Sequence, residues 1–433
     1  MSWNGWVFIY LPGKAVAVPA GSLELVEQGV ESTTSIFGYG RRYLERPDAV
    51  PVAPLSLPLT CRPGDELTYT PVLPPLFGAV RDAAPDFWGR RVLEARLKVP
   101  PDSVPESVYL LQAGPHRFGA LDFRSDLASP EAPGLLPPLT QLEYLLEAAD
   151  RIQAGAPIPA QLEQIFLAGS MGGARPKALV IHNGEQYLAK FPAIKDGFNV
   201  PAVERACLEL ARKAGLDVPP TDIKTLADGR QVMLIERFDR RATGDAFHRR
   251  HCVSALTLLA KHEAESLGAP YEDIAAKIGE LGVDAGVKAD RGELYGRIAF
   301  NILVSNDDDH LRNHAFVWDG GGKGWRLSPM YDVVPRPQLA HERYLHLSVG
   351  PQGRLATLDN LLEAHGSFGL LRKDAAAIID RIARVTREWR IFFEDLGVSA
   401  VDCDKVASAF RRPGEIGLEA VESALRRRPA PSE

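Results

Sequence analysis

The sequence predicts an α+β fold in which a β-rich first half precedes a helix-rich second half. Three observations support this prediction. Up to about residue 240, short apolar runs alternate with turns rich in Pro and Gly. From about residue 250, apolar residues recur mostly at helical spacing. The length of 433 residues exceeds what one hydrophobic core usually supports, which indicates two or three subdomains.

Residues 1–130 are expected to form short strands and turns. Apolar residues favour a strand at Trp6–Tyr10, and Arg62–Gly64 has the composition of a turn. One helical run is expected at Phe87–Leu97. This segment is therefore predicted to be mainly β.

Residues 131–160 are Pro-rich and are interpreted as a connector with a helix at Gln141–Ile152. A β-hairpin should follow, because the strand-like runs Ala178–His182 and Gln186–Phe191 flank Asn183-Gly184. A type I′ turn favours this pair, since both central residues need positive φ.

A helix is predicted to begin near Pro201 and to stop at Gly215, because Pro suits a first helical turn and Gly a helix end. The apolar run Val232–Ile235 indicates a buried strand. Beyond about residue 250 the only predicted strands are a pair near residues 314–318 and 324–328.

Composition indicates an ordinary soluble protein, with 45% apolar and 24% charged residues. The net charge of −6 argues against a protein that coats nucleic acid through general basicity. Four scattered cysteines without a CxxC pair indicate buried free thiols in a reducing compartment. With no signal-like N-terminus and no run of about 18 apolar residues, we expect a cytoplasmic protein that makes no membrane contact.

A Gly-rich segment, residues 169–177, precedes the hairpin and has small residues that let backbone amides approach an anion. It does not match a Walker A loop and is weak evidence alone. Lys190 lies within an apolar strand, where a charge is costly unless it is used. An edge-strand lysine that reaches solvent is the alternative. Glu204 on the next helix is the candidate partner, as in the strand lysine and helix glutamate of protein kinases.

The strongest signal is an acidic cluster, Asp307-Asp308-Asp309, directly after the apolar helical stretch Ile298–Val304. Adjacent carboxylates repel one another and rarely cluster without a cation. Asn313 follows Asp308 by five residues, the interval between catalytic Asp and metal-binding Asn in protein kinases. Asp332 comes after the predicted strand pair, in the position of a second metal-binding Asp. The pattern predicts phosphoryl transfer, with Asp308 as base and Asn313 and Asp332 as magnesium ligands.

Other interpretations of the cluster fit the spacing less well. An EF-hand loop counted from Asp307 would need Glu at its twelfth position, where Trp318 stands. His310 and His314 have the spacing of a helical zinc pair, but the predicted strand after Asn313 argues against one helical face. A solvated acidic turn remains an alternative.

Several motifs together resemble the HipA-type serine/threonine kinase toxins of bacterial toxin–antitoxin pairs. The N-terminal motifs are Phe37-Gly38-Tyr39 with Tyr43-Leu44, Leu55–Leu59, Phe77, Pro85–Arg90 and Arg117–Leu121. The later motifs are Gly172–Lys177, Ala189–Pro192, Glu236–Arg240, Asp308-x-His310-x-x-Asn313 and Leu327–Asp332. The resemblance spans nearly the whole chain.

The resemblance implies a protein-kinase-like two-lobe fold. A HipA-like N-terminal subdomain would occupy residues 1–130. A mainly β N-lobe, which contains the Gly-rich loop and the hinge, would occupy residues 131–240. An α-helical C-lobe would occupy residues 241–433. ATP and Mg²⁺ would be the cofactors, with ATP between the lobes.

The resemblance also assigns roles to residues. The ATP-binding set would be Gly172, Gly173, Ala174, Arg175, Lys177, Lys190, Glu236, Arg237, Phe238, His310, Asn313, Tyr331 and Asp332. Ser170 would be an autophosphorylation site, where added charge opposes ATP binding. Arg175-Pro176 departs from the Gln-Glu common in the family, and Pro176 removes a backbone donor.

In function, the resemblance implies a toxin that phosphorylates a protein, typically an aminoacyl-tRNA synthetase such as the glutamyl enzyme, and so arrests growth. A small helix-turn-helix antitoxin would be the partner, and DNA would be contacted only through that complex. The alternatives are a catalytically silent antitoxin-binding corepressor and a small-molecule or lipid kinase of the same fold.

Overall fold

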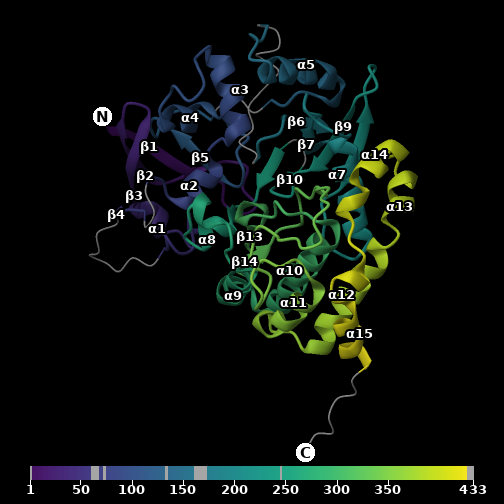
Figure 1. Ribbon diagram of the computed structural model, residues 1–433. Coiled ribbons are helices and arrows are strands. Elements are labelled where there is room, and N and C mark those ends of the chain that lie inside the picture. Colours follow the sequence, from purple (N-terminus) through teal and green to yellow (C-terminus); the bar gives the residue numbers. More distant parts are fainter. Residues whose placement is uncertain are drawn as a thin grey trace, which may run out of the picture. The chain divides into compact units, whose positions relative to one another are not determined.

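A computed structural model describes residues 2–59, 68–71, 75–131, 135–159, 173–243 and 246–426. The chain forms two compact units, each built from separate segments. Unit 1 comprises Met1–Lys195, Lys224–His262 and Ala315–Gly320, and unit 2 comprises Asp196–Ile223, Glu263–His314 and Gly321–Glu433. Strands dominate unit 1 and helices dominate unit 2 (Figure 1), which confirms the predicted α+β class. The division at residues 130 and 240 stays a prediction.

Unit 1 contains two larger sheets and several short helices. Its strands are β1 (Ser2–Ile9), β2 (Val18–Gln28), β3 (Glu31–Tyr39), β4 (Thr68–Tyr69), β5 (Leu121–Arg124), β6 (Lys177–His182), β7 (Glu185–Lys190), β9 (Gln231–Glu236), β10 (Arg240–Thr243), β11 (Ala246–Arg249), β12 (Cys252–Ser254) and β13 (Ala315–Asp319). Its helices are α1 (Arg41–Leu44), α2 (Gly78–Ala83), α3 (Phe87–Leu97), α4 (Glu106–Gln112), α5 (Leu142–Gln153) and α8 (Ala255–Leu258). The boundary with unit 2 runs through β8 (Thr221–Thr225).

The N-terminal sheet has the strand order β4-β3-β2-β1-β5, with antiparallel neighbours throughout. The predicted strand at Trp6–Tyr10 is thus the second half of the longer strand β1. The predicted helix at Phe87–Leu97 is confirmed as α3, and Asp86 caps it by accepting a hydrogen bond from the Gly89 amide at 2.9 Å. The predicted turn at residues 62–64 lies outside the described residues.

The second sheet has the order β6-β7-β9-β8 and contains the predicted hairpin. Asn183 and Gly184 have φ of 51° and 81°, which confirms the predicted turn with two positive values. β7 pairs with β6 on one side and β9 on the other. The interpretation of Lys190 as an edge-strand lysine is therefore wrong.

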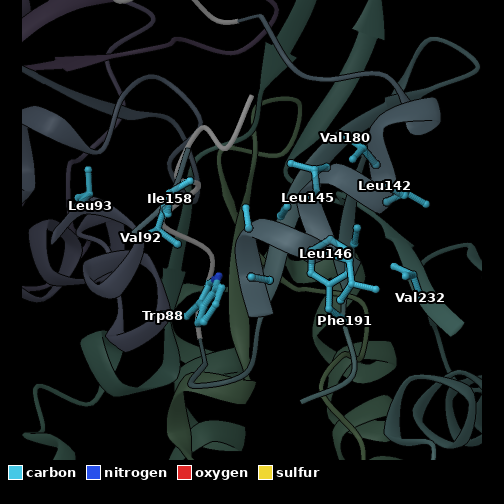
Figure 2. Packing of buried hydrophobic residues seen from close by; sticks show 14 of the residues in the cluster. Trp88, Val92, Leu93, Leu142, Leu145, Leu146, Ile158, Val180, Phe191 and Val232 are labelled. Atoms are coloured by element: carbon cyan, nitrogen blue, oxygen red, sulfur yellow. The ribbon is translucent and has the colours of Figure 1, made fainter. Parts of the chain in front are cut away.

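A hydrophobic core joins the second sheet to the helices before it (Figure 2). α5, the predicted connector helix, contributes Leu142, Leu145 and Leu146 to this core, opposite Val180 and Phe191 of the sheet region. Trp88 of α3 extends the cluster, and its indole donates a hydrogen bond of 2.8 Å to the Lys177 carbonyl. Burial of these apolar faces fixes both helices against the sheet.

A buried ionic cluster joins the end of the second sheet to the segment before β5. Asp239 accepts hydrogen bonds from Arg237 and Arg240, at 2.7 and 2.8 Å, and from the Gly119 amide at 2.8 Å. Both arginines also donate to the Arg117 carbonyl. Burial alone would raise the pKa of Asp239, but the two guanidinium charges hold it well below its usual range.

Gly119 is required in this cluster for two reasons. Its φ is 73°, a left-handed value that side chains disfavour. A Cβ at this position would also lie 3.1 Å from the Cys252 amide nitrogen, a tight contact that the neighbouring backbone would have to relieve by shifting.

The described residues of unit 2 are mainly helical, with β14 (Gly324–Leu327) and the first part of β8 as strands. Its helices are α7 (Val200–Lys213), α9 (Tyr271–Leu281), α10 (Asp284–Val304), α11 (Leu358–Glu363), α12 (Arg372–Thr386), α13 (Trp389–Asp395), α14 (Ala400–Val406) and α15 (Leu418–Arg426). α7 confirms the predicted helix. Gly215 follows it at φ 83°, and the predicted apolar face, including Val203, Cys207 and Leu210, is buried.

The structure differs from the sequence prediction after residue 240. The hairpin β10–β11 and the strand β12 lie in or beside the stretch that helical spacing assigns to helices. β12 forms because Cys252–Ser254 pairs with Ala315–Val317, a partner far along the chain that local periodicity does not reveal. Cys207, Cys252 and Cys403 are buried free thiols, as predicted, and Cys61 lies outside the described residues. Within the described ranges, no helix has the length and apolar character needed to cross a bilayer.

We expect Asp239→Asn to lower the free energy of unfolding by about 3–5 kcal/mol, because Arg237 and Arg240 would keep buried charges without a counter-charge. Urea denaturation measures this loss. Asp126→Asn, at an exposed carboxylate of the same unit, is the matched control and should cost less than about 1 kcal/mol. Equal losses of unfolding free energy in the two variants would show that the ionic cluster does not stabilise the fold as proposed.

Buried His251 predicts a pH dependence of stability. Burial lowers its pKa from 6.5 to about 4, against a hydrogen bond of 3.0 Å with the Val52 carbonyl oxygen. Between pH 4 and pH 6.5 the unfolded chain therefore binds more protons at this histidine than the folded chain does. The stabilisation is complete above pH 6.5 and is lost as the pH falls toward 4, by about 3 kcal/mol in total. The free energy of unfolding, measured with urea between pH 7 and 4.5, should depend less on pH in His251→Gln than in the wild type. The control His341→Gln, at an exposed position, should keep the wild-type pH dependence.

Candidate active site

A stripe of buried polar residues runs along helix α10. Asp290, Arg297 and Asn301 are buried, with 6%, 1% and 0% of their surfaces exposed. Intervals of seven and four residues place them on one face of the helix. Because buried polar groups must be paired, this stripe dictates which loops lie against it. We call Asp290, Arg297 and Asn301 the α10 polar stripe.

The first two members hold the segment that leads to Asp332. Asp290 accepts two hydrogen bonds from the Arg326 guanidinium, both of 2.8 Å, and one of 3.0 Å from the Leu327 amide. Arg297 donates to the Ser328 carbonyl at 2.7 Å. The chain that leaves β14 is thereby fixed along α10.

The third member holds the acidic cluster. Asn301 donates a hydrogen bond of 2.7 Å to Asp309, whose carboxylate also accepts from the Tyr271 hydroxyl and from His314 Nε2 at 2.9 Å. Burial would raise the pKa of Asp309, but His314 and the Tyr271 hydrogen bond keep it below its usual value. A buried carboxylate with three donors is an anchor and is not accessible as a base.

Asp308 is the exposed member of the cluster. α10 ends at Ser305, which has the left-handed φ of 51°, and the chain then turns so that 53% of the Asp308 side chain is exposed. The Asn313 amide donates to the Asp308 carbonyl at 3.1 Å, and its backbone N–H donates to the His310 carbonyl at 2.9 Å. The five-residue interval is therefore a closed loop, in which Nδ2 of Asn313 donates to the backbone while Oδ1 keeps the chemistry of a possible cation ligand.

Asp332 lies in a strained and firmly anchored loop. Its φ of 59° is in the left-handed region, which is uncommon for residues other than glycine. The preceding residues are held by hydrogen bonds of 2.8 Å from the Met330 amide to the Asp217 carbonyl and from the Tyr331 hydroxyl to the Arg312 carbonyl. Such strain concentrates at functional sites. The Tyr331 bond ties this loop to the one that carries Asn313.

The donor set fits magnesium. Amide and carboxylate oxygens, as at Asn313 and Asp332, are the ligands that Mg²⁺ takes from proteins. In the part of the chain that the structure describes, no group of three or more His, Cys, Asp or Glu side chains is arranged to hold a metal. A magnesium ion here would complete its shell with phosphate oxygens and water, as is usual at nucleotide sites.

Two residues that the sequence analysis does not single out contact the acidic cluster. Arg336 lies 3.2 Å from Asp307 and 2.5 Å from Asp308, and the Gln338 amide donates to Asp307. Burial raises the pKa of Asp307; Arg336 opposes this rise and Asp308 adds to it. Neither residue belongs to a recognisable motif, and only a loop return beyond Asp332 brings them here.

In unit 1, part of the candidate phosphate loop can be placed. Ser170 and Gly172 lie outside the described residues, whereas Gly173 and Ala174 are exposed and Arg175 is half-buried. Lys177 is buried, and its ammonium lies 3.3 Å from Asp86 and donates to the Gly173 carbonyl at 2.9 Å. Asp86 therefore neutralises the charge of Lys177, a residue to which the resemblance assigns ATP binding.

The resemblance makes Glu236–Phe238 the hinge that would meet adenine, and Glu236 and Lys190 lie at opposite ends of the β7–β9 pairing. Lys190 is opposite Met233, and Glu236 is opposite Tyr187. Burial, then the charge of Glu185, raises the pKa of Glu236. The backbone N–H of Arg237 donates a hydrogen bond to the Gln186 carbonyl. Its guanidinium donates to the Asp239 carboxylate and to the His116 and Arg117 carbonyls. Its side chain is structural, and the ring of Phe238 packs edge-on against Phe118.

Comparison with known families gives one domain match. A family model described as the HipA-like C-terminal domain matches residues 169–389, more than half of the chain. These residues include every candidate site residue of both units. The match confirms the resemblance seen in the motifs.

Two curated proteins are similar to this chain, and one of them spans most of it. A Sinorhizobium fredii (strain NBRC 101917 / NGR234) protein named "Putative kinase Y4mE" is 26% identical over 378 residues, which span 80% of this chain and 84% of that protein. A Haemophilus influenzae protein named "Putative kinase" is 28% identical over 157 residues, 33% of this chain and 44% of that one.

A solved structure shows the fold. It is HipA of Shewanella oneidensis MR-1, from a toxin–antitoxin complex of HipA, HipB and operator DNA. The TM-score is 0.63 at 17% identity, over 96% of this chain and 97% of that chain. The likeness confirms the fold that the motifs imply.

The α10 polar stripe can be tested by Asn301→Leu, which keeps the side-chain size but removes a donor from buried Asp309. We expect the free energy of unfolding to fall by about 1–3 kcal/mol and amide hydrogen exchange to accelerate in residues 305–313. Lys288→Ala, at an exposed position of the same helix, is the control. Unchanged exchange in Asn301→Leu would show that the acidic loop does not depend on the stripe.

Proposed function

The chain belongs to the HipA-like C-terminal domain family, and we propose that it is a Mg-ATP-dependent protein kinase that phosphorylates serine or threonine. One observation supports this proposal most. Of three adjacent carboxylates, only Asp308 is exposed, in a loop closed by Asn313 and tied through Tyr331 to the Asp332 loop. A base beside two magnesium ligands is the arrangement that phosphoryl transfer needs.

We assign the remaining contacts from the same reasoning. Asn313 and Asp332 would hold magnesium, with His310 and Tyr331 beside the metal site. Residues 172–177 and Lys190 would contact the phosphates, and residues 236–238 would meet the adenine. Lys177 forms an ion pair with Asp86, so a contact between its ammonium and phosphate would compete with that pair.

The reaction follows from these roles. Bound Mg-ATP supplies the γ-phosphoryl group and charge neutralisation. Asp308 accepts the proton of the acceptor hydroxyl as that oxygen bonds to phosphorus and ADP leaves. Asn313 keeps the Asp308 loop closed through the carbonyl contact, which limits the freedom of the base.

The finer proposals concern biology. We propose a toxin role with an aminoacyl-tRNA synthetase, such as the glutamyl enzyme, as the protein substrate, and autophosphorylation at Ser170 as an off-switch. The partner would be a helix-turn-helix antitoxin, with DNA reached only through it, in the cytoplasm. The complex of Shewanella HipA with HipB and operator DNA supports the partner proposal.

The proposed function predicts that Asp308→Asn lowers the rate of phosphate transfer from radiolabelled ATP about 10²–10⁴-fold, the usual contribution of a general base. Transfer to the chain itself and to a cell extract would be measured with magnesium. The melting temperature should barely change, because an exposed ion pair contributes little. Asp284→Asn, at an exposed carboxylate on α10, should keep full activity.

Other outcomes would select the alternatives. Wild-type chain that transfers no phosphate to protein, with Asp308→Asn indistinguishable from it, would support a silent antitoxin-binding corepressor. Transfer to a small-molecule or lipid fraction, and none to protein, would support a kinase of another substrate class.

A further inference from the structure

Arg336 makes the only ion pair of Asp308 among the described residues. Its Nη2 lies 2.5 Å from Asp308 Oδ2, and its Nε lies 3.2 Å from Asp307 Oδ1. One guanidinium thus bridges two carboxylates that are adjacent in the chain and repel each other. About half of the side chains of Arg336 and Asp308 is exposed, at 51% and 53%.

The backbone that carries Arg336 is fixed at the end of α10. Its N–H donates to the Ser305 carbonyl at 3.2 Å. Arg343, farther along the same loop, donates to the Ser305 hydroxyl at 2.6 Å and to the Gln338 carbonyl at 2.9 Å. The guanidinium therefore reaches Asp308 from an anchored loop and not from a free surface arm.

The bridge leaves the two Asp308 oxygens in different states. Oδ2 accepts from Arg336, while no described residue donates a hydrogen bond to Oδ1. The Arg336 bond restrains the plane of the carboxylate and leaves its second oxygen without a donor among the described residues. A base held in one orientation removes a proton more effectively than one that rotates freely.

We propose that Arg336 is a positioning residue, which holds Asp308 Oδ2 and offsets the charge of Asp307 so that Oδ1 meets the acceptor hydroxyl. This inference rests on the proposed kinase function. It assigns a role to a residue outside the kinase-like motifs. Arg336 itself touches neither the acceptor nor the nucleotide in this scheme.

The test compares Arg336→Ala with Arg390→Ala in the full chain. Arg390 is a matched control, because it is exposed and also bridges two carboxylates, Glu394 and Asp404, at 3.0 and 2.7 Å. We expect kcat of Arg336→Ala to fall about tenfold, with KM for ATP within about twofold of wild type. Both variants should melt within about 3 °C of wild type.

Three further measurements separate positioning from a general structural effect. Added methylguanidinium should restore part of the kcat of Arg336→Ala. The double variant Asp307→Asn/Arg336→Ala should lose less activity than Arg336→Ala, because the repelling charge is gone. Arg336→Lys, which keeps the charge but cannot bridge as a planar fork, should be intermediate.

The outcomes also separate this inference from the proposed function. If Asp308→Asn abolishes transfer while Arg336→Ala keeps kcat within twofold, the positioning role is wrong and the kinase function stands. A tenfold loss without any rescue by methylguanidinium or by Asp307→Asn would also overturn it. An inactive wild type would overturn both.

Discussion

The candidate active site depends on the burial of the α10 polar stripe. A charge or amide in an apolar interior is costly unless it is paired. Asp290 meets this requirement with Arg326 and the Leu327 amide, Arg297 with Glu293 and the Ser328 carbonyl, and Asn301 with Asp309 and Asn306. The helix therefore selects the position of two loops at once. The residues that enforce this arrangement have no role in the proposed chemistry.

The acidic cluster shows how environment separates identical side chains. Asp309 is buried and anchored, Asp307 is half-buried and held by Gln338 and Arg336, and Asp308 is exposed. Arg336 relieves the repulsion between Asp307 and Asp308, whereas Asp309 has its own partners, Tyr271, Asn301 and His314. Only one of them is left accessible, and it is the one whose carbonyl receives the Asn313 amide.

The same division applies to the motifs of unit 1. Arg237 and Asp239 lie in a motif that the resemblance links to adenine, yet their side chains form a buried ion pair with Arg240. Lys177 lies in the candidate phosphate loop, yet its ammonium is neutralised by Asp86. Some motif residues in this family member thus have side chains that serve the architecture.

Sequence alone determined the elements whose signals are local. The hairpin at Asn183-Gly184, the helices at residues 87–97 and 200–213, and the five-residue interval from Asp308 to Asn313 are of this kind, because turn chemistry and periodicity act between near neighbours. Only the tertiary structure decided that β12 pairs with β13, that Asp309 is buried, and that Arg336 reaches Asp308. These contacts join distant segments, and burial, which sequence spacing does not encode, selects among them.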